Sequence, residues 1–242
     1  MRTNRAVALG LDLGTTYSSA AWVNPSGEVE VLANSDGFST TPSVIFFDGD
    51  TILVGREALR CALLEPEKAA ECFKRDMGRA AHHRKVCGQT MRPEALSAMV
   101  LRKLLQDAET AVGPCDEAVI TVPAYFDDTR RKATQDAGRI AGVEVKAIIN
   151  EPTAAALYHG HGHAELAHRE QAVFLIYDLG GGTFDATLMR VHKDVDFETI
   201  ATDGDVMLGG RDWDKRLMDY VASEFTRKAG ADPREDDLSF QE

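Results

Sequence analysis

Two short segments place an aspartate at the end of an apolar run, directly before a turn rich in glycine and threonine. The first, LDLGTTYS, contains Asp12, and the second, IYDLGGGTFDA, contains Asp178. Such a turn can aim several backbone N–H groups at one phosphate, because glycine has no Cβ to keep the phosphate away. The aspartate would repel that phosphate unless a hard cation such as Mg²⁺ lay between them. Two such turns therefore favour a polyphosphate nucleotide with a metal ion.

The pairing of the two turns carries this prediction. A single glycine-rich turn between strands is usually only a hairpin. The chain contains no GxxxxGK[ST] sequence, and no GxGxxG follows a strand and opens a helix. Any nucleotide site is therefore expected to have a design other than these two common ones.

The first half of the chain predicts strands followed by helices. Short β-rich runs separated by glycine or asparagine predict a strand meander over residues 6–34, and a strand pair turns at residues 48–50. The residue pattern predicts helix from Arg56 to about Met77, with an interruption near Pro66. A helix is predicted from Pro93 to Ala111, because apolar residues recur on one face and a glycine follows its end.

Strands and helices alternate further along the chain. Strand AVITV, a helix over residues 127–140, strand VEVKAII and a helix over about 151–158 predict βαβ units with parallel pairing. A second meander follows, and then a helix over about 209–228. Both meanders share an apolar strand, Asp-Leu-Gly, a turn, an aromatic residue and a second strand, which indicates an internal duplication. If each copy opens a lobe, the two turns face each other across a cleft.

Charge and composition limit the classes of function. The 39 acidic residues outnumber the 27 basic ones, for a net charge of -12, which disfavours a general nucleic-acid or anionic-membrane surface. No apolar run approaches the ~18 residues of a membrane-spanning helix, and Asp12 interrupts the N-terminal run, so no secretory signal is predicted. Cys61, Cys72, Cys87 and Cys115 form no CxxC pair, which predicts reduced thiols in a cytoplasmic protein.

Six blocks in sequence order resemble the nucleotide-binding domain of DnaK-type heat-shock chaperones: LDLGTTYS, FKRDMGR, VITVPAYFDDTRRKATQDAGRIAG, IINEPTAAALYHG, IYDLGGGTFDATL and MLGGRDWDKRL. They cover almost the whole chain. Together they are far more specific than the actin, hexokinase and sugar-kinase superfold to which that domain belongs. The segment between FKRDMGR and Pro93 is short, and in this it resembles the HscC-type branch of the family.

The resemblance implies an α/β chain with an actin/hexokinase-like duplicated ATPase fold. Its expected parts are a first-lobe core (βββαβα) over residues 1–41 and 116–169, a small inserted subdomain over 42–115, the start of the second-lobe core over 170–208 and the start of its outer subdomain over 209–242. The first lobe is then nearly complete and the second truncated, because the family's domain continues past this point. We therefore expect a weak or inactive fragment that can self-associate through an uncovered second-lobe sheet.

The resemblance also implies roles for individual residues. Phosphates and nucleotide would contact Gly14, Thr15, Thr16 and Tyr17 in the first turn, Gly180, Gly181, Gly182 and Thr183 in the second, and Gly209 and Gly210 beyond it. Asp12 and Asp178 would hold Mg²⁺ through water. Lys74 would reach the terminal phosphate and the attacking water. Glu151 would orient water or metal, and Thr183 completes the expected catalytic set.

Several of these residues also have a purely structural interpretation. Without the resemblance, Lys74 would be taken as an ordinary solvated lysine. Glu151 lies in the first turn of a predicted helix, where the helix dipole stabilises a carboxylate regardless of catalysis. Asp185 either positions water or braces the hairpin. Pro123 and Arg131 are candidate parts of a switch that reports the nucleotide state, although Pro123 also suits the end of a strand.

The histidines offer a second kind of candidate site. His159, His161 and His163 alternate with glycine, and such a tract can bind Zn²⁺ or Ni²⁺. A flexible surface connection without a nearby cysteine is a poor metal cage, so a metal site is not favoured there. His82 and His83 are expected to be exposed.

The favoured function is the N-terminal part of a chaperone ATPase, which binds Mg-ATP or Mg-ADP between two lobes and uses hydrolysis to switch a peptide-binding domain. The implied partners are ATP, unfolded peptides, a J-domain co-chaperone and a nucleotide-exchange factor, with no nucleic acid and no membrane. Two other classes remain open. One is a non-enzymatic interaction module or an inert fragment. The other is a sugar-kinase-type phosphotransferase, which would lack the FKR and NEPTAAA blocks.

Overall fold

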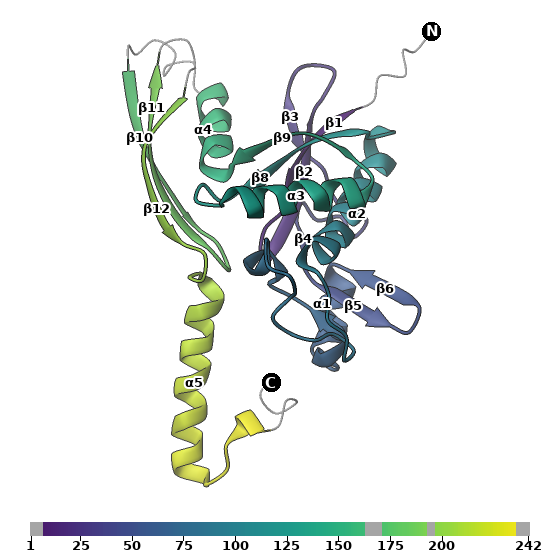
Figure 1. The fold of residues 1–242 in the computed structure, drawn as a ribbon, viewed down its shortest axis with the longest axis vertical. Helices are drawn as coiled ribbons and strands as arrows, with labels where there is room; N and C mark the ends of the chain where they lie inside the picture. Colours follow the sequence, from purple (N-terminus) through teal and green to yellow (C-terminus); the bar gives the residue numbers. More distant parts are fainter. Residues whose placement is uncertain (1–6, 163–170, 193–196, 236–242) are drawn as a thin grey trace.

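The computed structural model describes residues 7–162, 171–192 and 197–235. These residues form a mixed α/β structure with three visible parts (Figure 1). A body of sheet and helices comes from residues 7–162. A curved three-stranded sheet lies beside it, and a long helix extends from one end of that curved sheet.

The first sheet combines the N-terminal meander with the two crossover strands. Its strands are β1 (Ala8–Asp12), β2 (Tyr17–Val23), β3 (Val29–Val31), β8 (Glu117–Val122) and β9 (Glu144–Asn150), in the order β3-β2-β1-β8-β9, with β4 (Thr41–Pro42) paired to β2. β1 is antiparallel to β2 and parallel to β8, and β8 is parallel to β9. The parallel pairing predicted from the sequence is confirmed. It places the carboxyl ends of β1, β8 and β9 at one edge, where ligands of such sheets commonly bind.

Three helices cover this body. α2 (Pro93–Val112) packs against α3 (Asp128–Ala141) and β2, and its buried face contains the predicted Leu96, Val100 and Leu104. The Asp127 side chain caps α3 by accepting a hydrogen bond from the Arg130 N–H at 2.9 Å. α4 (Glu151–Gly162) starts directly after β9 and contacts both β9 and the curved sheet. It continues beyond the predicted end near Tyr158 and includes His159 and His161, while His163 lies outside the described residues.

The helix predicted from Arg56 to Met77 is wrong beyond the first seven residues. α1 (Arg56–Ala62) is followed by two 3₁₀ turns, η1 (Pro66–Lys68) and η2 (Phe73–Asp76), on either side of the short strand β7 (Ala69–Ala70). β7 pairs with β5 (Ile45–Asp48), which also pairs with β6 (Thr51–Val54) in a separate three-stranded sheet. The buried Ala69 and Ala70 gain ladder hydrogen bonds from a strand more than twenty positions away, so tertiary pairing overrides their helix propensity.

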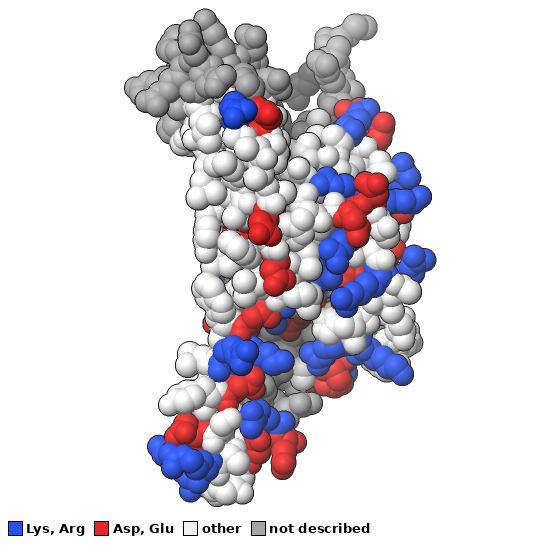
Figure 2. Space-filling model, turned by 60° about the vertical axis from the view of Figure 1, so that its left-hand side comes forward, with Lys and Arg blue, Asp and Glu red and all other residues white. Residues whose placement is uncertain are grey.

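The second meander forms the curved sheet. β10 (Gln171–Leu179), β11 (Phe184–His192) and β12 (Phe197–Asp205) pair antiparallel in chain order. Val173, Leu175 and Tyr177 alternate along β10 and are each more than half exposed. Figure 2 shows few charged side chains over this part of the molecule, above the long helix. That helix, α5 (Gly210–Ala229), agrees with its predicted bounds within one residue, and η4 (Pro233–Glu235) follows it. Among the described residues, no helix has both the length and the apolarity to cross a membrane.

Gly138 marks the closest approach of α3 to the first sheet. A Cβ at this position would lie 2.4 Å from Val145 Cγ2 and 3.0 Å from Ile120 Cδ1. Valine is stiff at χ1 and cannot easily yield. We expect Gly138→Ala to lower the free energy of unfolding by about 1–3 kcal/mol in urea denaturation, although alanine favours a helix. The exposed Lys132→Ala in the same helix should change it by less than about 0.5 kcal/mol. Equal stability of the two variants would contradict this packing.

Candidate functional site

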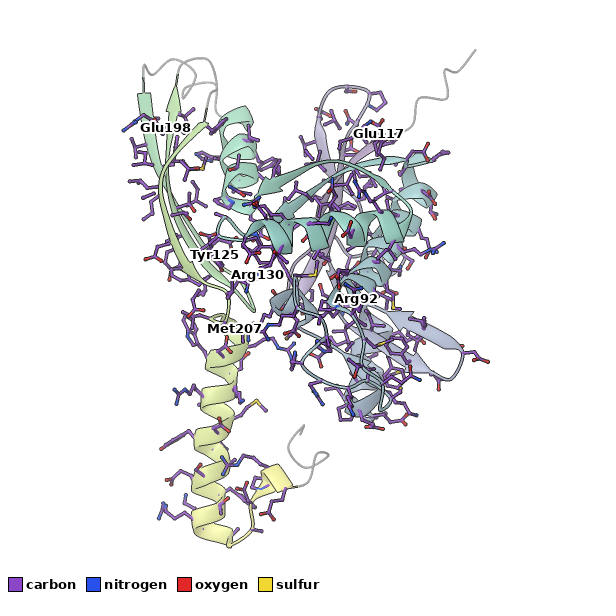
Figure 3. All side chains as sticks on the ribbon, in the orientation of Figure 1. Arg92, Glu117, Tyr125, Arg130, Glu198 and Met207 are labelled. Atoms are coloured by element: carbon purple, nitrogen blue, oxygen red, sulfur yellow. The ribbon has the colours of Figure 1, made fainter. Side chains whose placement is uncertain are left out.

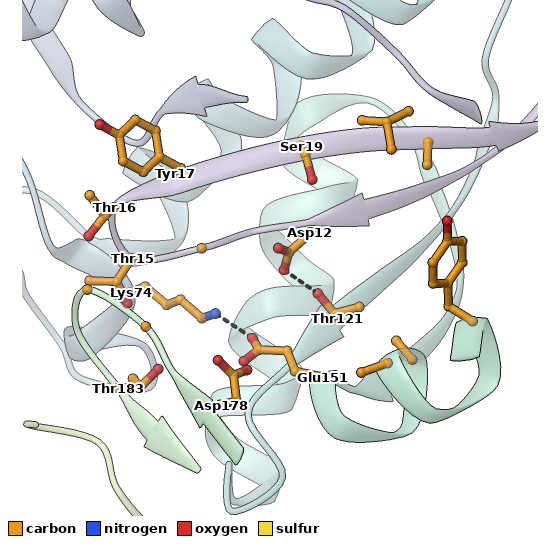
Figure 4. Close-up of a pocket in the computed structure, with 18 of the residues that line it drawn as sticks. Asp12, Thr15, Thr16, Tyr17, Ser19, Lys74, Thr121, Glu151, Asp178 and Thr183 are labelled. Atoms are coloured by element: carbon orange, nitrogen blue, oxygen red, sulfur yellow. Dashed lines mark hydrogen bonds and ion pairs between the residues drawn. The ribbon is translucent and has the colours of Figure 1, made fainter. Parts of the chain in front are cut away.

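A cavity of about 730 Å³ lies where the first sheet, α4 and the turn between β10 and β11 meet (Figure 4). Of the residues predicted to act in catalysis or binding, the lining contains Asp12, Gly14, Thr15, Thr16, Tyr17, Lys74, Glu151, Asp178, Gly180, Gly181 and Thr183. Ser19, Ala21, Val29, Val31, Thr121, Ala154, Ala155 and Tyr158 complete it. The structure thus brings together both glycine-rich turns and all the predicted ionisable groups of the site.

Four separate elements deliver the charged groups. Asp12 is the last residue of β1, and Glu151 is the first residue of α4, directly after β9. Parallel strands end at the same edge, so both carboxylates reach the cavity from one side of the first sheet. Asp178 comes from β10 in the curved sheet, and Lys74 comes from η2, between β7 and α2.

Lys74 is not the solvated lysine that its sequence context alone would favour. Its side chain is only 4% exposed, and its Nζ donates to Glu151 Oε1 at 2.6 Å. Figure 4 shows the Lys74 ammonium directed at Glu151, with the Asp178 carboxylate beside it. A buried ammonium needs such a partner, because an unpaired charge away from water is strongly unfavourable.

Negative charge exceeds positive charge in this group. Burial raises the pKa of Glu151 above its ordinary value of 4.5, and the Asp12 charge raises it further, while Lys74 opposes the shift. Burial also raises the pKa of Asp178, again with Lys74 opposing and Asp12 adding to the effect. Three carboxylates therefore share the single charge of Lys74. A divalent cation would relieve this repulsion and favour the ionised forms of Glu151 and Asp178.

The two glycine-rich turns touch each other. A Cβ on Gly181 would lie 1.9 Å from Thr16 Oγ1, and a Cβ on Gly182 would lie 2.2 Å from Thr15 Cγ2. Glycine is therefore the residue that fits at these two positions. Within the second turn, the Gly180 N–H donates to the Thr183 carbonyl at 3.0 Å. The two turns are therefore in direct contact, whereas the sequence predicted that they face each other across a cleft.

The hydroxyl groups of two threonines lie at this contact. Thr15 Oγ1 and Thr16 Oγ1 are buried and have no hydrogen-bond partner within the described ranges 7–162, 171–192 and 197–235. Buried polar groups in proteins are nearly always paired. A phosphate oxygen or a water on a bound cation would satisfy both hydroxyls. The residues present therefore fit a phosphate group accompanied by a metal ion.

Gly182, Gly209 and Gly210 lie outside the cavity lining. The Gly210 N–H donates to the Gly180 carbonyl at 3.0 Å, so the start of α5 is stacked behind the second turn. A Cβ on Gly209 would lie 2.4 Å from the Gly182 nitrogen. Gly182, Gly209 and Gly210 therefore form the contact between the start of α5 and the second glycine-rich turn.

Asp185 braces the junction between the two sheets. Its side chain is buried, its Oδ2 accepts from the Ala124 N–H at 2.8 Å, and its Oδ1 accepts from the hydroxyls of Thr187 and Thr202. The next residue after Ala124, Tyr125, donates its hydroxyl to the Phe184 carbonyl at 3.1 Å. Figure 3 shows Tyr125 between the first body and the curved sheet. This geometry fits the bracing interpretation of Asp185.

Both predicted switch residues belong to the same junction. Pro123 directly precedes the Ala124–Tyr125 contact with the curved sheet. Arg131 Nη2 donates to the Ala124 carbonyl at 3.1 Å and to Asn150 Oδ1 at 2.6 Å. Arg131 therefore ties the end of β8 to the end of β9, one residue before Glu151.

Sequence reasoning missed two polar contacts of the site. Thr121 donates its hydroxyl to Asp12 Oδ1 at 2.7 Å, across the β1–β8 pair. Arg75 Nε donates to the Gly182 carbonyl at 2.7 Å, and its guanidinium also forms an ion pair with Asp212. The FKR block was the available signal for Arg75, because it places a second cation directly after Lys74. Thr121 carried no signal beyond its place in a β-rich run.

Comparison with known proteins gives consistent matches. A family model described as Hsp70 protein matches residues 8–242. The chain is 46% identical over 243 residues to proteins described as "Chaperone protein DnaK" from Thermotoga neapolitana, Thermotoga petrophila and Thermotoga maritima. Each alignment covers 100% of this chain and 40% of the relative. The chain thus spans about two fifths of the length of these curated relatives.

The raised pKa of Glu151 predicts a loss of stability as pH rises. The native state keeps this proton to higher pH than the unfolded chain does, so the free energy of unfolding falls as pH rises above about 4.5. Glu151→Gln should make this fall shallower in urea denaturation between pH 4.5 and neutral pH. The exposed Glu109→Gln on α2 is the control and should keep the original slope. Equal slopes for the unmodified chain and Glu151→Gln would contradict the shift.

Proposed function

The chain belongs to the Hsp70 family, and from this premise we propose that it binds Mg-ATP and Mg-ADP at the cavity as part of a chaperone ATPase. The observation that carries the proposal is the meeting of two glycine-rich turns at one cavity, with two buried threonine hydroxyls that have no partner in the described part of the chain. A triphosphate held between the turns would pair these hydroxyls and receive backbone N–H groups from both sides.

We propose the duplicated actin/hexokinase-like arrangement as the fold behind this site. The hairpin β1–β2 and the hairpin β10–β11 have the same order of strand, glycine-rich turn and strand, which supports a duplication. The separate sheet β6-β5-β7 lies within residues 42–115, which supports an inserted subdomain there. The core of the first lobe would then be 1–41 with 116–169, and the second lobe would begin at 170–208 and 209–242.

The carboxylates would hold the metal and the water. Asp12, from β1, and Asp178, from β10, both line the cavity and would hold Mg²⁺ through its water shell. When bound, Mg²⁺ supplies charge compensation to the phosphate oxygens. Glu151, whose pKa is raised by burial, would orient the attacking water and is suited to accept its proton.

Lys74 would act on the transferred phosphoryl group. Its ammonium lies at the cavity and is held there by Glu151. In an in-line attack by water, negative charge spreads over the oxygens of the terminal phosphate, and a fixed cation stabilises that charge more than it stabilises the ground state. Thr183, on the second turn, would donate its hydroxyl to the same phosphate.

In a protein of the relatives' length, we propose that the nucleotide state is passed to a peptide-binding domain for unfolded peptides. The junction of Pro123, Arg131 and Asp185 supports this, because it joins the edge of the first sheet, which carries Glu151, to β11. A J-domain co-chaperone and a nucleotide-exchange factor would be the regulatory partners. A non-enzymatic interaction module is the second candidate, favoured by the exposed apolar side chains of β10.

Removing one unpartnered hydroxyl tests nucleotide binding. Thr15→Val keeps the shape of the side chain and removes an oxygen that has no partner among the described residues, so the free energy of unfolding should not fall. The affinity for Mg-ADP should fall about tenfold, which corresponds to about 1.4 kcal/mol for one lost hydrogen bond to a charged group. Isothermal titration calorimetry and urea denaturation measure the two effects.

Thr187→Val is the matched control. It removes a hydroxyl that pairs with Asp185 and Thr202, so it should lower stability by about 1 kcal/mol without a direct loss of ligand contact. Unchanged Mg-ADP affinity in Thr15→Val would contradict the proposed phosphate contact. If the unmodified chain binds no Mg-ADP at all, the proposal fails for this chain, and the interaction module is favoured.

A further inference from the structure

Three side chains converge on one oxygen atom outside the cavity. Asp76 Oδ2 lies 2.8 Å from His82 Nδ1 and 2.6 Å from His83 Nδ1, and it also accepts the His83 backbone N–H at 3.0 Å. One donor atom from each of the three residues lies within 4.8 Å of the others. No other trio of histidine, cysteine, aspartate or glutamate side chains within 7–162, 171–192 and 197–235 comes this close.

The cluster is buried on one side and open on the other. The Asp76 and His82 side chains are 3% and 1% exposed, whereas the His83 side chain is 46% exposed. The expectation that both histidines are exposed is therefore wrong for His82. Burial arises because the segment after η2 folds back, with the His82 N–H bonded to the Met91 carbonyl at 2.8 Å. The open side at His83 gives an ion a route in and room for a water ligand.

Arg79 pairs with one oxygen of the Asp76 carboxylate and leaves the other, Oδ2, to the two histidines. Arg79 Nη1 donates to the other carboxylate oxygen, Asp76 Oδ1, at 3.0 Å, and the Arg79 side chain is more than half exposed. Among the described residues, the hydrogen-bond partners of Asp76 Oδ2 are the two imidazoles and the His83 N–H. A cation placed between Oδ2 and the two Nδ1 atoms would meet three ligand atoms without displacing Arg79.

We propose that Asp76, His82 and His83 form a binding site for one divalent transition-metal ion of the Zn²⁺ type. Two imidazole nitrogens and one carboxylate oxygen are ligands that Zn²⁺ prefers, at bond lengths of about 2.0–2.2 Å, with water in the fourth position. Neighbouring ligands around a tetrahedral ion are then about 3.4 Å apart. The two nitrogen–oxygen distances must therefore open by about 0.6–0.8 Å, to which the half-exposed His83 can contribute most.

The proton balance of binding is simple. An imidazole with one proton must carry it on Nδ1 in order to donate it to Asp76. On binding, this proton moves to Nε2, and the freed Nδ1 lone pair binds the metal. Mg²⁺ and Ca²⁺ prefer oxygen ligands, so this site differs in chemistry from the Mg²⁺ site proposed at the cavity. It would fasten the C-terminal end of η2, the same short element that presents Lys74.

Spectroscopy on the untagged, chelator-treated chain tests the site. The background should carry His161→Asn and His163→Asn to remove the competing histidine tract. We expect one Co²⁺ per chain with the visible absorption of a four-coordinate ion, displaced by one Zn²⁺. His83→Ala, at the half-exposed ligand, should weaken Zn²⁺ binding at least about tenfold. The neighbouring Cys87→Ser should leave the affinity unchanged.

A second measurement separates a lost ligand from a lost fold. Zn²⁺ should raise the midpoint of thermal unfolding of the background chain, because it binds the native state, and should raise it much less in His83→Ala. Circular dichroism without metal should show the same secondary structure in both. No saturable Co²⁺ or Zn²⁺ binding, equal affinity in His83→Ala, or loss of binding in Cys87→Ser would each overturn the proposed ligand set.

Discussion

The buried contact between Lys74 Nζ and Glu151 Oε1 is the interaction on which the site depends. Lys74 can be buried because carboxylates from two sheets surround it, and those carboxylates can approach one another because Lys74 lies among them. Removing one partner of such a pair leaves a charge buried without compensation. The 3₁₀ turn η2, the parallel edge of the first sheet and the curved sheet are thus linked through one group of charges.

The contact of the two glycine-rich turns is the second constraint. Gly181 and Gly182 approach Thr16 and Thr15 so closely that any Cβ would collide. This approach brings both turns to one cavity and buries two hydroxyls that have no partner among the described residues. Asp185, on β11, also links the curved sheet to the first body by accepting a hydrogen bond from the Ala124 N–H. The contact of the two turns is the basis of the proposed phosphate site.

Local patterns predicted the elements that end in these turns. Alternation and turn residues located β1, β2, β10 and β11, and the apolar spacing of Leu96, Val100 and Leu104 located α2. The segment from Arg56 to Met77 was mispredicted, because its course depends on pairing of Ala69 and Ala70 with a distant strand. The cluster of Asp76, His82 and His83 was not predicted for the same reason, since burial of His82 requires the chain to fold back at Met91. Side-chain contacts between segments far apart in sequence leave no local periodicity to detect.

The most direct test of the account is single-turnover hydrolysis of ATP by a protein of the relatives' length that carries this chain, compared with its Lys74→Ala variant. Loss of one preorganised cation that acts on the transition state is expected to slow hydrolysis by at least about a hundredfold. Nucleotide should remain bound, because the two turns and their threonines are unchanged. Hydrolysis at the original rate with nucleotide bound would contradict the central place of Lys74.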